Sequence, residues 1–89
     1  MNYFVYILIN LDKKPFHTYV GSTNNLNKRL FLHNSSKGAK FTRGRLWKLI
    51  YKKKYKTKIE ALKNEYKLKK NSKKRALIKF NYLYKKIKI

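Results

Sequence analysis

The stretch YFVYILINLDKKPFHTYVG, residues 3–21, decides the fold. Residues 3–10 are rich in the β-branched and aromatic side chains that favour strands, and residues 17–21 show the same preference. The residues between them, 11–15, include Asp, Lys and Pro, which are typical of a turn. We therefore predict that the chain begins with a β-hairpin.

Beyond the hairpin, helical and strand patterns alternate. Residues 22–24 are good helix N-caps, and leucines then recur at helical spacing. The predicted elements are a helix over residues 24–34, a basic loop over 37–45, a strand over 47–55, and helices over 57–70 and 72–86. This order predicts an α/β (α+β) fold with a small three-stranded, antiparallel-type sheet and flanking helices. We expect residues 1–89 to form one domain, with its core over about 3–70 and a basic helical tail over about 72–89.

Composition narrows the functional class. A net charge of +22, from 25 basic and 3 acidic residues, favours a polyanionic partner such as nucleic acid. The chain has no cysteine, which excludes a disulfide framework, a zinc–thiolate centre and a thiol nucleophile. No apolar run approaches the roughly 20 residues of a membrane span, and no signal peptide is recognisable. We expect a cytoplasmic protein without a membrane partner, and we leave its oligomeric state open.

Five short motifs follow one another along the chain. They are Phe4-Val5-Tyr6, Tyr19-Val20-Gly21, Arg29 with His33, the loop of residues 38–44, and Glu65 in the helix predicted over 57–70. In this order they resemble the signature of the GIY-YIG nucleases over residues 3–70, and the similarity is greatest to small stand-alone bacterial members. Phe4 stands where the first motif has its glycine.

The resemblance implies a DNA endonuclease that depends on one Mg²⁺ or Mn²⁺ ion and leaves 3′-hydroxyl and 5′-phosphate ends. It suggests DNA repair, recombination or mobile-element processing as the setting. Many relatives carry an active-site asparagine, which the sequence leaves unassigned between Asn71 and Asn81. Eukaryotic relatives add a cysteine-rich partner-binding module, and we expect none in this cysteine-free chain.

The three acidic residues differ in their local sequence. Asp12 lies in the predicted hairpin turn, where an acidic residue is ordinary. Glu60 follows Thr57 by three residues, which is the capping-box spacing at a helix start. Glu65 is the remaining carboxylate, and we predict that it binds the metal ion. The alternative is an ion pair with Lys69 on a solvated helix face.

Four further residues are predicted to take part in catalysis. Tyr6 and Tyr19 face each other across the predicted hairpin, and either phenol could activate the attacking water if a cation or metal favours the phenolate. The alternative is that the two rings only pack across the strands. Arg29 and His33 are four residues apart on one helix and point the same way. Arg29 would grip the scissile phosphate, and His33 would hydrogen-bond a tyrosine or the phosphate, or shuttle a proton.

The basic loop and the C-terminal tail are the remaining candidates for binding. Phosphate contacts with an interleaved stacking aromatic suit the loop residues Lys37, Lys40, Phe41, Arg43 and Arg45. In the tail, an apolar stripe formed by Leu77, Phe80, Tyr84 and Ile87 could bind a membrane, RNA or the domain's own sheet, and we favour the sheet. Two alternatives to a nuclease stay open: a non-catalytic basic nucleic-acid-binding protein and a peripheral membrane protein.

Overall fold

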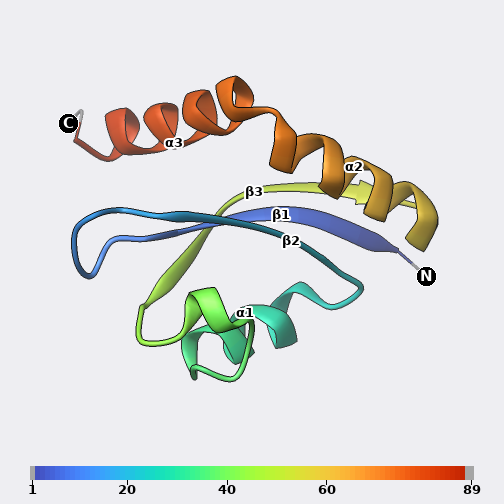
Figure 1. Cartoon of the computed structure of the whole chain (residues 1–89), viewed down its shortest axis with the longest axis horizontal. Coiled ribbons are helices and arrows are strands. Elements are labelled where there is room, and N and C mark those ends of the chain that lie inside the picture. The colour runs from blue at the N-terminus through green and yellow to red at the C-terminus, as the bar shows by residue number, and fades with distance from the viewer. Residues whose placement is uncertain (1, 88–89) are drawn as a thin grey trace.

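The computed structural model describes residues 2–87, with side chains as far as Lys85. A three-stranded sheet lies between one helix on one face and two helices on the other (Figure 1). The elements are β1 (Tyr3–Asn10), β2 (Thr18–Thr23), α1 (Leu26–Asn34), the 3₁₀ turn η1 (Lys40–Thr42), β3 (Trp47–Tyr55), α2 (Lys58–Lys70) and α3 (Ser72–Ile87). The predicted α+β fold and its element order are confirmed.

The sheet has the order β2-β1-β3, and both pairings are antiparallel. Because β1 is central and covered on both faces, its residues 5–10 are all buried, which accounts for its nearly unbroken apolar run. Asn10 ends this strand at the hairpin: its side chain donates to the Lys13 carbonyl at 2.8 Å and accepts from the His17 amide at 2.7 Å. β2 is an edge strand, so one side of its backbone is open.

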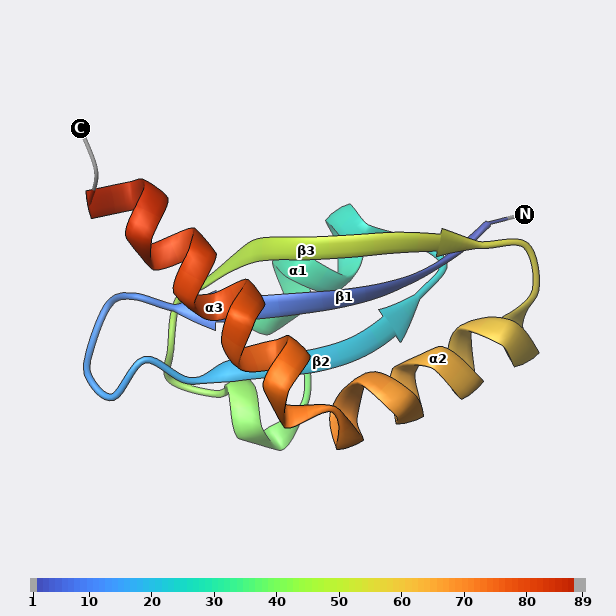
Figure 2. The same cartoon turned by 90° about the horizontal axis from the view of Figure 1, so that it is seen from above.

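Alternate residues of β1 serve two cores, because neighbouring side chains on a strand point to opposite faces. On one face Val5 and Ile7 pack with Ala61 and Leu68 of α2. The core on the other face contains Tyr6, Leu8 and Trp47, with Leu26 and Leu30 of α1 packed against it. Figure 2 shows α2 running beside β2 while α3 crosses toward β3. The sheet therefore separates α1 from α2.

The start of α1 differs from the sequence prediction. β2 continues through Thr23, and the helix begins at Leu26 instead of near residue 24. Asn25 is the N-cap, since its Oδ1 accepts from the Lys28 amide at 3.1 Å. Ser22, a predicted cap, is instead hydrogen-bonded to α2. Ser22 and Thr23 pair with β1 as additional strand residues, so the helix cap lies further along the chain, at Asn25.

The start of α2 agrees with the prediction. Thr57 is the N-cap, and its hydroxyl oxygen accepts from the Glu60 amide at 3.1 Å. The same hydroxyl donates to Glu60 Oε1 at 3.2 Å, so the carboxylate of the predicted capping box binds the side chain of the cap residue. Glu60 is thereby held at the exposed end of the helix.

The predicted docking of the tail through its apolar stripe is wrong. Leu77, Phe80 and Tyr84 are 58%, 64% and 52% exposed, and the side chain of Ile87 lies outside the described residues. α3 contacts the sheet core through Ile78 on a neighbouring face of the helix. Within residues 2–87, no helix has both the length and the apolar character required to span a bilayer.

Candidate active site

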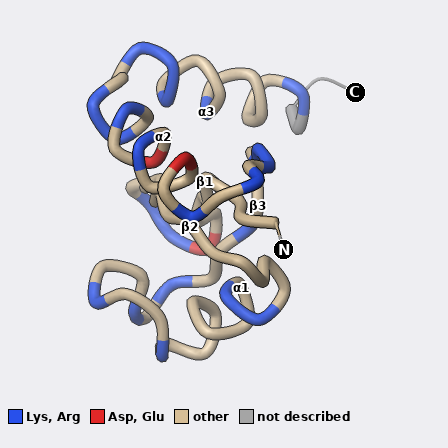
Figure 3. The backbone as a smooth tube through the Cα atoms, turned by 90° about the vertical axis from the view of Figure 1, so that its right-hand side faces the viewer, with Lys and Arg blue, Asp and Glu red and all other residues tan. Residues whose placement is uncertain are grey.

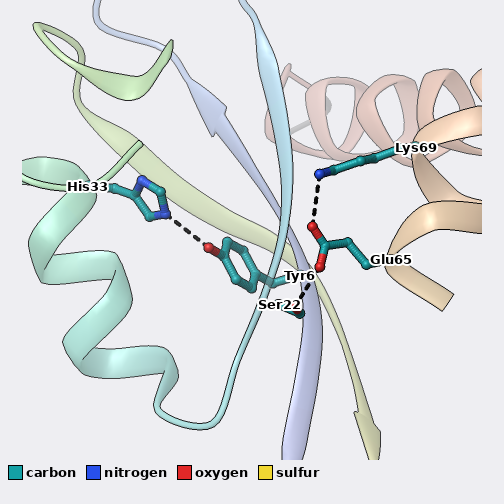
Figure 4. A network of polar contacts seen from close by, with 5 residues as sticks. All are labelled: Tyr6, Ser22, His33, Glu65 and Lys69. Carbon is teal, nitrogen blue, oxygen red and sulfur yellow. Dashed lines mark hydrogen bonds and ion pairs between the residues drawn. The ribbon is translucent and has the colours of Figure 1, made fainter. Parts of the chain in front are cut away.

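A buried hydrogen bond joins the first tyrosine to the helical histidine. Tyr6 Oη lies 2.9 Å from His33 Nε2, and the two residues are 2% and 0% exposed (Figure 4). The other ring nitrogen, Nδ1, lies 2.9 Å from Thr42 Oγ1 in the η1 turn. Tyr6, His33 and Thr42 thus connect β1, α1 and the basic loop through one chain of hydrogen bonds.

Two glycines make room for this pair. Gly21 lies directly across from Tyr6 in the β1–β2 register, and a Cβ built there would meet the Tyr6 hydroxyl and ring. A Cβ built on Gly38 would meet His33 Nδ1. Both positions therefore require a residue without a side chain so that the phenol and the imidazole can meet.

We expect Gly21→Ala to destabilise the protein by about 1–3 kcal/mol, because the new methyl group overpacks against the Tyr6 ring. Gly44→Ala is the control, since Gly44 has φ 75° and open space around it. Its cost, on the order of 1 kcal/mol, comes from the backbone alone and leaves the Tyr6 ring in place. Urea unfolding measures both costs, and an unchanged chemical shift of the Tyr6 ring in Gly21→Ala would contradict the packing argument.

Tyr19 lies on the same face of the sheet as Tyr6, but diagonally. Its register partner on β1 is Leu8, so the two tyrosines are not directly opposite as the sequence suggested. The Tyr19 ring centroid is 6.5 Å from that of Tyr6 and 5.0 Å from that of His33. The two phenols therefore have different surroundings, and Tyr6 is the one hydrogen-bonded to the histidine.

Arg29 adds a positive charge beside the pair. Burial raises the pKa of Tyr6 to about 12, while hydrogen bonding to Arg29 and the Arg29 charge lower this pKa, and the charges of Tyr19 and Glu65 raise it. Burial, followed by the Arg29 charge, lowers the pKa of His33 to about 4. The resting pair is therefore a neutral phenol and a neutral imidazole at physiological pH.

Glu65 approaches the site from the other face of the sheet. Its Oε1 accepts from Ser22 Oγ at 2.5 Å, and its Oε2 lies 2.9 Å from Lys69 Nζ (Figure 4). The Glu65 side chain is 16% exposed. The ion pair with Lys69 that the sequence offered as an alternative is thus present, but so is a second, less exposed contact to β2.

The two halves of the site meet at the edge strand. Gly21 faces the Tyr6–His33 pair, and its neighbour Ser22 faces Glu65, so a single step along β2 connects the two faces. A groove of about 250 Å³ lies along this edge, with Tyr19 and Phe41 from one side of the sheet and Lys69 and Arg75 from the other. A phosphodiester lying along β2 could contact groups from both faces.

This combination of fold and motifs has a counterpart among known families. A model described as the GIY-YIG catalytic domain matches residues 2–81. The chain belongs to the GIY-YIG family. It is 46% identical to a UPF0213 protein of Oceanobacillus iheyensis over 68 residues, which are 75% of this chain and 76% of that one. It is 54% identical to a UPF0213 protein of Bacillus licheniformis over 57 residues, which are 63% of this chain and 59% of that one.

A solved structure agrees with this assignment. The solution NMR structure of a UPF0213 protein from Bacillus halodurans is 38% identical in sequence, with a TM-score of 0.50. The match covers 90% of this chain and 85% of that one. The resemblance to small bacterial GIY-YIG proteins is confirmed. The names of these relatives state no activity, so the case for the chemistry of this GIY-YIG domain rests on its site.

Predicted DNA contacts of the GIY-YIG domain lie in and around the η1 turn. Lys37, Lys40 and Arg43 are exposed. Phe41 is 52% exposed, and its ring stacks on that of Tyr19 with 6.3 Å between the ring centroids. Arg45 is half-buried, and its Nη1 is buried without a hydrogen-bond partner among the described residues. The loop therefore presents exposed cations, and its one aromatic ring lines the groove beside Tyr19.

Charge alone does not locate the site. Lys and Arg are spread over every helix and along β3, as Figure 3 shows, while Glu60 and Glu65 both lie on α2. Within the described residues, no three histidine or acidic side chains form a cluster that could hold a metal ion. A metal ion at Glu65 would therefore rely on water and substrate oxygens for its other ligands.

Proposed function

We propose that this protein is a divalent-metal-dependent DNA endonuclease, with the scissile phosphate bound at the edge of β2. The observation that carries the proposal is the buried hydrogen bond between Tyr6 and His33, beside Arg29. Gly21, which lies opposite Tyr6, is followed directly by Ser22, whose hydroxyl contacts Glu65. A buried phenol–imidazole hydrogen bond places a proton donor next to a proton acceptor. Such a pair is suited to moving a proton.

Glu65 is the proposed ligand for Mg²⁺ or Mn²⁺. Mg²⁺ is commonly held by one or two carboxylates together with waters and substrate phosphate, so a single glutamate fits this ion. Lys69 does not lock the carboxylate, because an ion pair with a 51% exposed lysine contributes little. When bound, the metal supplies positive charge that stabilises the phosphoryl oxygens during hydrolysis.

Tyr6 is the proposed general base, acting through His33. The attacking water gives a proton to Tyr6 Oη as the proton of Tyr6 passes to His33 Nε2, so the phenol is neutral before and after the step. His33 becomes an imidazolium during the step, and the negative phosphate bound by Arg29 offsets the guanidinium charge that disfavours this form. The water oxygen then forms a bond to phosphorus, and the bond from phosphorus to the 3′ oxygen breaks. The 3′ oxygen takes a proton from solvent and leaves as a hydroxyl, and His33 returns its proton to solvent through Tyr6 once the products have left. Arg29 binds the phosphate and stabilises the negative charge that develops there.

The bound strand is proposed to run along β2, between the η1 turn and α2. Phe41 and Tyr19 offer ring faces on one side of the groove, and Lys69 and Arg75 offer cations on the other. Aromatic faces stack on bases of any sequence, and lysines and arginines contact phosphates. The proposed interface therefore positions DNA by its backbone.

DNA binding is expected to weaken steeply as salt rises, with about −0.9 in the slope of log affinity against log salt for each duplex phosphate neutralised. Arg43→Ala and Arg45→Ala should weaken binding to unrelated sequences equally and make the slope shallower. Fluorescence anisotropy at several salt concentrations measures both effects. Losses confined to one DNA sequence would instead indicate base readout by these arginines.

Cleavage assays with single-stranded, branched and duplex DNA test the proposed function. The purified protein, with and without Mg²⁺ or Mn²⁺, should cut at least one of these substrates only when metal is present. A non-catalytic nucleic-acid binder would bind all three and cut none. A peripheral membrane protein would bind vesicles of anionic lipid through α3, and its binding would be lost when Leu77 and Phe80 are replaced by Ser.

A further inference from the structure

The hydrogen bonds around His33 define which ring nitrogen carries the proton. Thr42 Oγ1 lies 2.8 Å from the carbonyl oxygen of Ala39, which can only accept. The single hydroxyl proton of Thr42 therefore points at Ala39. Thr42 Oγ1 must then accept from His33 Nδ1, 2.9 Å away, so Nδ1 carries the proton.

The opposite tautomer is disfavoured by the same contacts. With the proton on Nε2, the unprotonated Nδ1 would require the Thr42 hydroxyl to turn toward it. The Thr42 oxygen and the Ala39 carbonyl oxygen would then face each other at 2.8 Å without a proton between them. Thr42 and His33 are themselves buried, so the repulsion between these two oxygens is costly.

We propose that Thr42 is a positioning residue that holds His33 with its proton on Nδ1, which leaves Nε2 free to receive the proton of Tyr6. The chain of donors runs from Tyr6 Oη to His33 Nε2, from His33 Nδ1 to Thr42 Oγ1, and from Thr42 Oγ1 to the Ala39 carbonyl. The proton-transfer part of this proposal rests on the proposed nuclease function. The assignment of the His33 tautomer does not depend on that function.

Thr42 is itself held firmly. It is fully buried, its amide donates to the Ala39 carbonyl at 3.0 Å, and its own carbonyl accepts from Trp47 Nε1 at 2.9 Å. Its neighbours Phe41 and Arg43 are exposed and belong to the predicted DNA-contact loop. The loop that is predicted to contact DNA therefore also orients the imidazole, through a single residue.

Charged and titratable groups on three elements act electrostatically on the Tyr6–His33 pair, Glu65 from the other face of the sheet. They are Tyr19 on β2, Arg29 on α1 and Glu65 on α2. Arg29 disfavours the imidazolium form of His33, and burial acts in the same direction, lowering the pKa of His33 to about 4. The neutral imidazole is thus the form whose tautomer needs to be set.

Nitrogen-15 NMR of labelled histidine tests the assignment without any substrate. In the wild type, His33 should show a protonated Nδ1 and an unprotonated Nε2. Thr42→Val removes the hydroxyl at nearly constant volume and should shift His33 toward the opposite tautomer. Thr42→Ser keeps a hydroxyl and should retain the wild-type pattern. His17, whose backbone and not its ring is bonded to Asn10, is the internal control and should not change.

Single-turnover cleavage under the same conditions tests the functional part. Thr42→Val should lower the rate at least about tenfold and at most by the 10²–10⁴-fold that a general base contributes, with DNA affinity retained and the rate restored in Thr42→Ser. A wild-type His33 protonated on Nε2, or an unchanged tautomer in Thr42→Val, would overturn the proposal. If the wild type cuts no DNA while the tautomer shifts as expected, the role of Thr42 stands and the nuclease function fails.

Discussion

Glu65→Gln is expected to lower the rate of DNA cleavage by orders of magnitude while the melting temperature without metal changes little. Glutamine keeps the side-chain volume and the helix propensity, and its oxygen can still accept from Ser22. It loses the charge that a divalent ion requires. The lost ion pair with the exposed Lys69 contributes at most about 1 kcal/mol. Single-turnover cleavage and thermal unfolding measure the two effects.

Glu60→Gln is the matched control for this substitution. It removes the same charge from the same helix, five residues earlier, and glutamine preserves the capping-box interaction with Thr57. DNA binding should tighten slightly in both variants, because each removes a negative charge, but cleavage should fall only in Glu65→Gln. Glu60→Ala removes only an exposed hydrogen bond to Thr57, which still caps the backbone amide of residue 60, so it should cost less than about 1 kcal/mol of stability and leave cleavage per folded molecule intact. Normal cleavage by Glu65→Gln would show that Glu65 is not the metal ligand.

Tyr6→Phe should reduce cleavage by about 10²–10⁴-fold, because it deletes the hydroxyl that accepts the proton of the attacking water. The ring stays packed in the core, but His33 Nε2 loses its buried partner, so stability should also fall by about 1–3 kcal/mol. Single-turnover rates, measured at a temperature where the variant is fully folded, separate the two effects.

Tyr19→Phe is the companion measurement. Tyr19 packs against His33 and Phe41 through its ring, which phenylalanine preserves. We therefore expect a clearly smaller loss of cleavage than in Tyr6→Phe. A larger loss of cleavage in Tyr19→Phe than in Tyr6→Phe would mean that Tyr19 is the general base. Full activity in both variants would mean that both rings serve only in packing.

The element order was predictable because the local signals are strong and agree with one another. A β-rich hairpin with a clear turn, a Thr57–Glu60 cap and the leucine spacing of α1 each specify an element without reference to the rest of the chain. The spacing of the capping pair also distinguishes Glu60 from Glu65 by sequence alone. Local chemistry was sufficient at these positions.

Contacts between distant segments could not be read in the same way. Ser22 looked like a helix cap, but its hydroxyl binds Glu65, 43 residues away. Thr42 looked like one polar residue in a basic loop, because nothing in the loop's composition shows that a 3₁₀ turn buries it against His33. The exposed stripe of α3 was misjudged because a helical repeat gives the apolar face but not the surface that the helix meets.

The division of the site between two faces of the sheet also depends on tertiary structure. The alternation of side chains in β1 and β2 could be counted, but the face covered by each helix could not. Once α1 and α2 are placed on opposite faces, Tyr6 and Glu65 can meet only around β2, where Gly21 has no side chain. This arrangement explains in physical terms why the second motif, Tyr19-Val20-Gly21, ends in a glycine.

The most direct test of the central claim is the metal dependence of cleavage by the wild-type protein. Protein treated with EDTA is mixed with end-labelled DNA of the structure that it cuts, and the product is followed before and after excess Mg²⁺ is added. The account predicts no product before the addition and, after it, fragments with 3′-hydroxyl and 5′-phosphate ends. Equal cleavage in EDTA, or no cleavage of single-stranded, branched or duplex DNA with any divalent ion, would contradict it.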